Sequence, residues 1–305
     1  MRLRRRRNVN FPAMSATARP AAHPLALAGL LAGACAIAFA PILVRFSEVG
    51  PVATAFWRIL LALPVAFLWL AAERRGAAAP LRWRPLALCG LFFAGDLAVW
   101  HVSLKLTTVA NSTLLVNMAP IFVTLGAWLL FRTRVTATFL LGMALGLGGA
   151  ALLAAASAGF SSGHLRGDAL ALVAAVSYAG YILAIKTLRD TLGTGTIMAL
   201  SGVFTCLGLL PATLLLGESV VPQTARGWAV LILLALVCQL AGQSLITWAM
   251  RHLPASFSAV SLLLQPVVAA LLAWVLLAEA VGCLQALGAA AVLAGIYVAR
   301  RGSPA

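Results

Sequence analysis

One apolar segment, with a proline near its middle and a tryptophan at its end, occurs twice in this chain. The first copy covers residues 115–128 and the second covers residues 261–274. Pro120 and Pro266 are 146 positions apart, and the two tryptophans are separated by the same shift. The further pairs at this shift are Gly142 with Gly288, Gly149 with Gly295, and Lys105 with Arg251. These five matches indicate an internal duplication, which limits the folds open to the chain.

The composition is that of a protein that crosses a membrane several times. The chain of 305 residues is 63% hydrophobic and only 10% charged, and its mean hydropathy is +1.02. Soluble domains are nearer about half apolar and about a quarter charged, so a soluble fold could not bury this much apolar surface. The net charge of +15 does not indicate a nucleic-acid partner, because the arginines lie at segment ends and in the N-terminal tail.

Ten apolar segments of about 20 residues each are long enough to cross roughly 30 Å of hydrocarbon as α-helices. We expect them at residues 25–44, 52–71, 85–104, 109–131, 136–156, 168–188, 195–216, 227–249, 254–277 and 281–299. Because the loops between them are short, neighbouring helices must be antiparallel and in contact. The sequence therefore predicts an all-α integral membrane protein with ten transmembrane helices.

Residues 1–24 form a basic tail that we expect to be disordered and cytoplasmic. A cleaved signal peptide is one alternative for this region, and translation from Met14 is another. We favour a retained first helix, because the segment Leu25–Val44 is longer than the apolar part of a typical signal peptide. It also has a counterpart in the second half, at Leu170–Lys186.

The distribution of arginine and lysine predicts the orientation in the membrane. With the N-terminus in the cytoplasm, 17 of these residues fall on the inner side and 4 on the outer side, and Arg58 lies within a segment. The outer residues are Arg45, Lys105, Arg166 and Arg226. The positive-inside rule therefore favours cytoplasmic N- and C-termini, in a bacterial inner (plasma) membrane.

Duplication and topology together predict two inverted repeats of five helices. The first repeat covers residues 25–156 and the second covers residues 168–299. Because five is an odd number, the second copy enters the membrane in the opposite direction. Inverted repeats are typical of secondary transporters, whose substrate site lies near the midplane where the repeats meet.

Two runs of the sequence are similar to those of a known family. They are Asn111-Ser-Thr-Leu-Leu-Val-Asn-Met-Ala-Pro120 and Gln265-Pro266…Trp274…Leu277-Ala-Glu279. Over about residues 25–299 the chain resembles the EamA-type permeases of the drug/metabolite transporter (DMT) superfamily. The resemblance implies that the third, fourth, eighth and ninth helices line a central cavity. It also implies export, since many members export amino acids or other small metabolites.

One corner of the sequence departs from that family. Members often have a glutamate after the fourth helix, as Glu279 stands after the ninth. Here Thr133 occupies the corresponding place, between Arg132 and Arg134. A symmetric pair of glutamates is therefore incomplete in this chain.

Polar side chains inside the segments are the candidates for the substrate cavity, because such groups are costly in hydrocarbon and face the bundle interior. The candidates are Asp96, Trp100, Thr113, Asn117, Tyr178, Gln239, Gln243, Ser261 and Gln265. At about 1.5 Å per residue, several of them lie about 12–15 Å from a membrane surface, so we expect one shared polar layer. Hydrogen bonds between helices are the structural alternative for each of them.

Arg58 and Asp96 lie on adjacent helices, about 9 Å and about 12 Å below the outer surface, and we expect an ion pair between them. The pair is either structural or part of transport, if Asp96 takes up a proton in one state. Pro120 and Pro266 are expected to kink their helices. His101, nearer the outer surface, is expected to belong to a solvated rim.

The sequence has no pattern typical of an enzyme, a metal site or a cofactor site. The five cysteines show no CxxC spacing, and neither a Walker loop nor HExxH occurs. We therefore expect no catalytic residue, no metal and no cofactor. The expected partners are a small-molecule substrate and the lipid bilayer, with protons and a second copy in a homodimer as open candidates.

The favoured function is a secondary transporter that exports a small organic metabolite, amino-acid-like or drug-like, by alternating access. An importer or exchanger of a vitamin or nucleotide-like solute is the alternative within this class. A membrane enzyme or a lipid-handling scaffold is the alternative from another class.

Overall fold

A computed structural model describes residues 24–75, 80–158, 165–277 and 282–303. This described part is helical without β-strands, and it contains ten spans long and apolar enough to cross a membrane. The span ends agree with the predicted segments within three residues, so the all-α integral membrane fold is confirmed. The predicted tail, apart from Pro24, and Glu279 lie outside the described residues.

Each span is either one helix or a chain of consecutive helices. In order they are α1 (Pro24–Ile37) with α2 (Ala40–Arg45), α3 (Pro51–Leu60) with α4 (Leu63–Glu73), α5 (Trp83–Leu106), α6 (Val109–Val116) with α7 (Ala119–Phe131), α8 (Ala137–Ala158), α9 (Leu165–Arg189), α10 (Thr194–Leu215), α11 (Ala225–Leu233) with the π-helix η1 (Leu234–Gln243) and α12 (Ser244–Ala249), α13 (Ala255–Ser261) with α14 (Leu264–Leu277), and α15 (Cys283–Gly302).

The first, second, fourth and ninth spans are interrupted shortly before a proline. The interruptions lie two or three residues ahead of Pro41, Pro64 and Pro120, and three or four residues ahead of Pro266. A proline has no N–H, and its ring clashes with the carbonyl four residues earlier, so it kinks or breaks an α-helix. The fourth and ninth spans are thus broken at places that differ by only one residue under the 146-residue shift.

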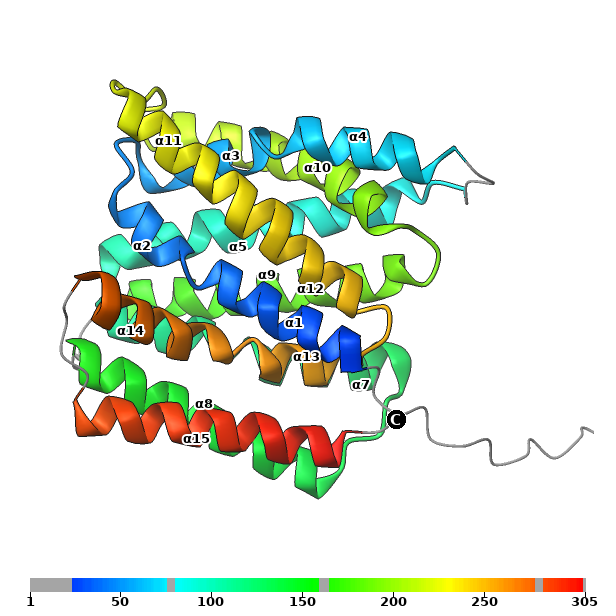
Figure 1. Cartoon of the computed structure of the whole chain (residues 1–305), viewed down its shortest axis with the longest axis vertical. Helices are drawn as coiled ribbons and strands as arrows, with labels where there is room; N and C mark the ends of the chain where they lie inside the picture. The colour runs from blue at the N-terminus through cyan, green and yellow to red at the C-terminus, as the bar shows by residue number, and fades with distance from the viewer. Residues whose placement is uncertain (1–23, 76–79, 159–164, 278–281, 304–305) are drawn as a thin grey trace, which may run out of the picture.

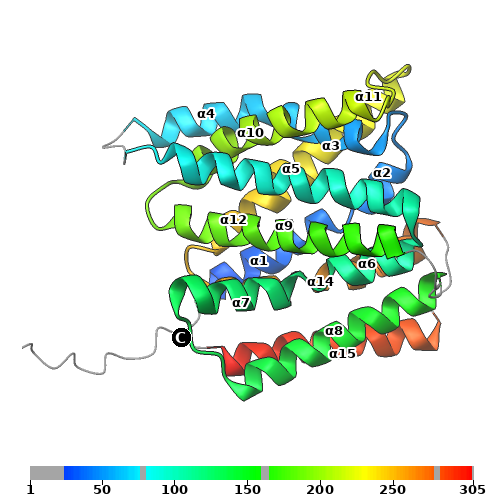
Figure 2. The same cartoon turned by 180° about the vertical axis from the view of Figure 1, so that it is seen from behind.

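The helices lie side by side in two matching groups (Figure 1). At one edge α8 packs against α15, and at the opposite edge α4 packs against α10. Between the edges, α5 packs on α9 just as η1 packs on α1, and α7 packs on α9 just as α14 packs on α1. Figure 2, seen from behind, shows α9 between α5 on one side and α6 with α7 on the other.

The contact between α8 and α15 depends on glycines that face each other. A Cβ atom at Gly149 would lie 2.6 Å from the Gly288 carbonyl oxygen, and one at Gly142 would lie 2.7 Å from that of Gly295. Only glycine lets the two backbones approach this closely. The 146-residue shift moves Gly142 onto Gly288 and Gly149 onto Gly295, so it exchanges the two contacts.

Two carboxylates cap helices of the other half in a reciprocal way. Glu73, at the end of α4, accepts hydrogen bonds from the backbone N–H groups of Gly195 at 2.8 Å and Thr196 at 2.9 Å, where α10 begins. Glu218, just after α10, accepts one from the Ala53 N–H at 2.9 Å, where α3 begins. A carboxylate stabilises the free N–H groups and the dipole of a helix N-terminus.

Trp128 and Trp274 lie near the ends of their spans and are 54% and 53% exposed. They stand at equivalent positions, one near the end of α7 and the other near the end of α14. Tryptophan is enriched at membrane–water interfaces, and exposed tryptophan rings at the ends of spans would lie at such an interface.

Candidate functional site

Charged and amide side chains are buried inside the bundle on α3, α5 and η1. Arg58 and Asp96 are each only 8% exposed, and His101 is 4% exposed. Gln239 and Gln243, on η1, are also buried. Polar groups at this depth of a membrane protein are expensive and usually functional.

Three residues on α3 and α5 gather around a small cavity of about 30 Å³ between α2, α3 and α5. They are Arg58, Trp100 and His101, and each carries a buried nitrogen without a hydrogen-bond partner: Nε, Nε1 and Nε2 respectively. The other ring nitrogen of His101, Nδ1, donates to the Leu97 carbonyl oxygen at 2.5 Å. His101 is therefore buried, and the prediction of a solvated rim was wrong for it.

Arg58 and Asp96 do not form the expected ion pair in this conformation. No nitrogen of Arg58 lies within 4.0 Å of an Asp96 oxygen, although the Arg58 charge acts on that carboxyl. The observed helix ends explain the difference. Arg58 is seven residues from the start of α3, and Asp96 is ten residues from the end of α5, which gives depths of about 10 Å and about 15 Å. Arg58 is therefore nearly level with Trp100 instead.

The eighth span contains a π-helix, η1, which packs against α1 and α3. The side-chain atoms Gln239 Oε1, Gln243 Nε2 and Ser244 Oγ are buried without a partner. Wide π-helical turns are rare in proteins, and those that do occur are often found at functional sites. No proline lies in this stretch, so sequence inspection had no signal for it.

Aromatic rings of α9 line the same region. Tyr181 stacks on Phe93 with the ring centroids 4.3 Å apart, and Tyr178 lies 6.1 Å from Tyr181. Gln243 interacts with Tyr181 from the opposite half of the chain. The structure thus brings Tyr178 and Gln243, two of the predicted residues, into one neighbourhood.

The remaining predicted residues lie on the broken fourth and ninth spans. Asn117 ends α6 at the break, and Thr113 and Gln265 are, like Asn117, half-buried. Ser261 is fully buried, and its hydroxyl donates to the Phe257 carbonyl at 2.9 Å, within its own helix. None of these four residues lines the small cavity or the larger cavity near the C-terminus that is described next. A single shared polar layer therefore stays a prediction.

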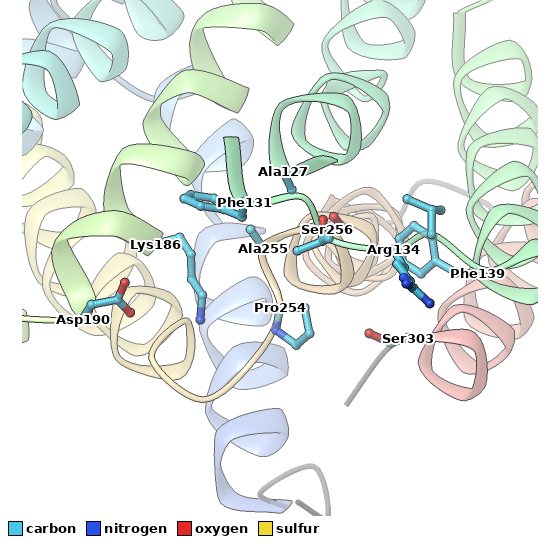
Figure 3. A pocket seen from close by; sticks show the side chains of 12 residues that line it. Ala127, Phe131, Arg134, Phe139, Lys186, Asp190, Pro254, Ala255, Ser256 and Ser303 are labelled. Atoms are coloured by element: carbon cyan, nitrogen blue, oxygen red, sulfur yellow. The ribbon is translucent and has the colours of Figure 1, made fainter. Parts of the chain in front are cut away.

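A larger cavity of about 260 Å³ lies at the end of the bundle near the C-terminus (Figure 3). Figure 3 shows Lys186 and Asp190 on one side of it and Arg134 with Phe139 on the other. Lys186 Nζ donates to the carbonyl of Met250 at 2.9 Å, at the end of the eighth span. The remaining lining residues are Ala127, Phe131, Thr133, Val135, Pro254, Ala255, Ser256 and Ser303.

This cavity near the C-terminus was not predicted. It is assembled from residues at the ends of five spans. In the sequence these residues cannot be distinguished from ordinary loop residues. Among the described residues no group of three or more histidine, cysteine, aspartate or glutamate side chains could hold a metal ion.

Comparison with known proteins decides the family. The chain matches the EamA-like transporter family twice, over residues 23–155 and 165–301. It belongs to the EamA-like transporter family. The resemblance seen in the sequence is thereby confirmed, and this EamA-like protein is a multi-pass membrane transporter.

Two similar proteins support this assignment. An uncharacterized transporter of Archaeoglobus fulgidus is 29% identical over 266 residues, which cover 84% of this chain and 89% of the relative. A solved crystal structure of a protein that is 20% identical shares the fold, with a TM-score of 0.76 over 93% of this chain and 99% of the other. These findings point to a transporter rather than an enzyme.

Proposed function

We propose that this EamA-like protein is a secondary transporter that exports a small organic metabolite by alternating access. The observation that carries the proposal is the set of buried, unpartnered side-chain atoms on α3, α5 and η1. Nearly all buried polar groups in proteins have a hydrogen-bond partner, so a cluster without partners calls for a ligand. Atoms of this kind inside a membrane bundle suit the amino-acid-like or drug-like solutes that the family resemblance implies.

Alternating access needs two halves that can move against each other, and we infer that these are the inverted repeats 25–156 and 168–299. Three observations support the inference: the breaks in the fourth and ninth spans, the exchanged glycine contacts, and the reciprocal caps of Glu73 and Glu218. Each relates a feature of one half to its counterpart in the other half, and the two caps lie at opposite ends of the bundle. A rotation by a half turn about an axis in the membrane plane has this effect.

The broken spans supply the moving parts. The inner halves of the fourth and ninth spans, α7 and α13, pack on each other. The breaks before Pro120 and Pro266 let the outer halves, α6 and α14, swing separately. The inner cavity of about 260 Å³ offers a substrate access from the cytoplasm, which favours export.

Metabolite profiling of the medium tests this function. Cells that produce the protein should release at least one small metabolite faster than cells that lack it. Cells that produce the variant Asp96→Asn, which is expected to lose uphill transport, serve as the matched control for membrane insertion. If the medium of producing and non-producing cells has the same composition under varied growth conditions, export is refuted.

The proposed orientation, with both termini cytoplasmic in a bacterial inner membrane, has its own test. Arg75 and Val221 are both exposed and are related by the 146-residue shift. In a cysteine-free background, we expect Arg75→Cys to react with a membrane-impermeant thiol reagent only from the cytoplasm. Val221→Cys should react only from outside. Labelling of both positions from the same side would contradict the inversion, and labelling from exchanged sides would reverse the orientation.

A further inference from the structure

The small cavity between α2, α3 and α5 combines an apolar wall with unpaired nitrogen atoms. The wall consists of Ala40, Pro41, Val44, Ala55 and Leu97. The only hydroxyl in the lining, that of Thr54, donates at 2.9 Å to the carbonyl of Gly50, the N-cap residue of α3. The nitrogens of Arg58, Trp100 and His101 are therefore the groups left to bind a ligand.

The chemistry of these nitrogens specifies an anion. Arg58 Nε and Trp100 Nε1 carry hydrogen and can only donate, and the guanidinium is always charged. Since His101 Nδ1 donates to Leu97, Nε2 of the neutral ring is an acceptor, and it donates to an anion only when the ring is protonated. Two donors and a permanent positive charge, held beside an apolar wall, fit a group with two adjacent acceptor oxygens.

No acidic side chain of the described residues supplies that group. Asp96 does not reach Arg58 within 4.0 Å. Glu218 is already bound to Lys105 Nζ at 3.2 Å and to the Ala53 N–H at 2.9 Å. An arginine without a close ion pair inside a bundle is costly, and an anion from outside the chain would supply that pair.

We propose that Arg58, Trp100 and His101 form a subsite for the carboxylate group of an organic anion. The proposal rests on the proposed transport function and names the substrate class for it. A cavity of about 30 Å³ holds a few atoms at most, so only the carboxylate enters and the rest of the molecule lies outside it. The exported metabolite is therefore a carboxylic acid in its ionised form.

Binding of acetate to the purified full-length protein tests the subsite without any transport. We expect sodium acetate to raise the melting temperature, while sodium chloride at the same concentration and neutral acetamide do not. In Arg58→Gln the half-maximal acetate concentration should rise by about 10-fold or more, as expected for a lost charge-assisted hydrogen bond. Trp100→Phe removes only the indole N–H and keeps the ring, so it tests the subsite even if Arg58→Gln does not fold.

Arg226→Gln is the matched control, because it removes one exposed positive charge at the outer end without touching the cavity. Its response to acetate should equal that of the unchanged protein. No effect of acetate, an equal effect of chloride, or an unchanged response in Arg58→Gln and Trp100→Phe would each overturn the subsite. An export experiment that finds metabolites without a carboxylate would also overturn it and leave the transport function standing, whereas an unchanged medium refutes export itself.

Discussion

We expect Gly149→Ala to prevent α8 and α15 from packing in this EamA-like transporter, and so to lower its stability sharply. The added methyl group would lie 2.6 Å from both the Gly288 carbonyl oxygen and the Val292 nitrogen. Both are backbone atoms, so no side chain can rotate away, and the helices have to separate. Overpacking of this kind costs about 1–3 kcal/mol and occasionally more. Thermal unfolding followed by size-exclusion chromatography of the purified protein measures the loss.

The neighbouring residue provides the control. Gly148 is exposed, and a Cβ atom there meets nothing within 4 Å. Gly148→Ala should therefore be neutral or stabilising by up to about 1 kcal/mol, since alanine favours a helix more than glycine does. Gly295→Ala, at the position equivalent to Gly149, should behave like Gly149→Ala. Equal stability of the variants at 148 and 149 would show that this helix contact does not hold the bundle together.

The second large effect is expected at Asp96, whose change to asparagine should abolish uphill transport driven by a pH gradient. Asp96 is buried in the middle of α5, whereas the other described acidic residues lie at or beyond the ends of spans. It is thus the carboxyl of the described chain that is placed to carry a proton through the bundle. Accumulation in proteoliposomes should fall at least about 10-fold, while exchange of substrate across the membrane persists.

Stability measurements separate this role from a structural one. Because Arg58 and Asp96 form no close ion pair, we expect Asp96→Asn to keep most of its thermal stability. If the single variant is strongly destabilised and the added change Arg58→Gln restores it, the two residues form a structural bridge. If Asp96→Asn is folded and transports against a gradient with unchanged pH dependence, Asp96 has neither role.

Several features of the site were within reach of the sequence, and others were not. Depth along a helix follows from residue count, so the burial of Asp96 and Gln239 and their distance from the surface could be predicted. Depth says nothing about rotation around the helix axis or about the true ends of a helix. Small errors in two helix ends placed Arg58 beside Asp96, although it is nearly level with Trp100.

The ten spans, the membrane and the duplication were determined by the sequence alone. A helix in hydrocarbon satisfies its own backbone and needs only a long apolar run, which is a local property of the chain. The 146-residue shift can likewise be read directly from matching residues in the sequence.

The tertiary structure decided which side chains meet. The cavity of Arg58, Trp100 and His101, the π-helix η1, and the larger cavity near Lys186 depend on how separate spans pack and rotate. Such contacts join residues far apart in the chain, and no local pattern of residues encodes them.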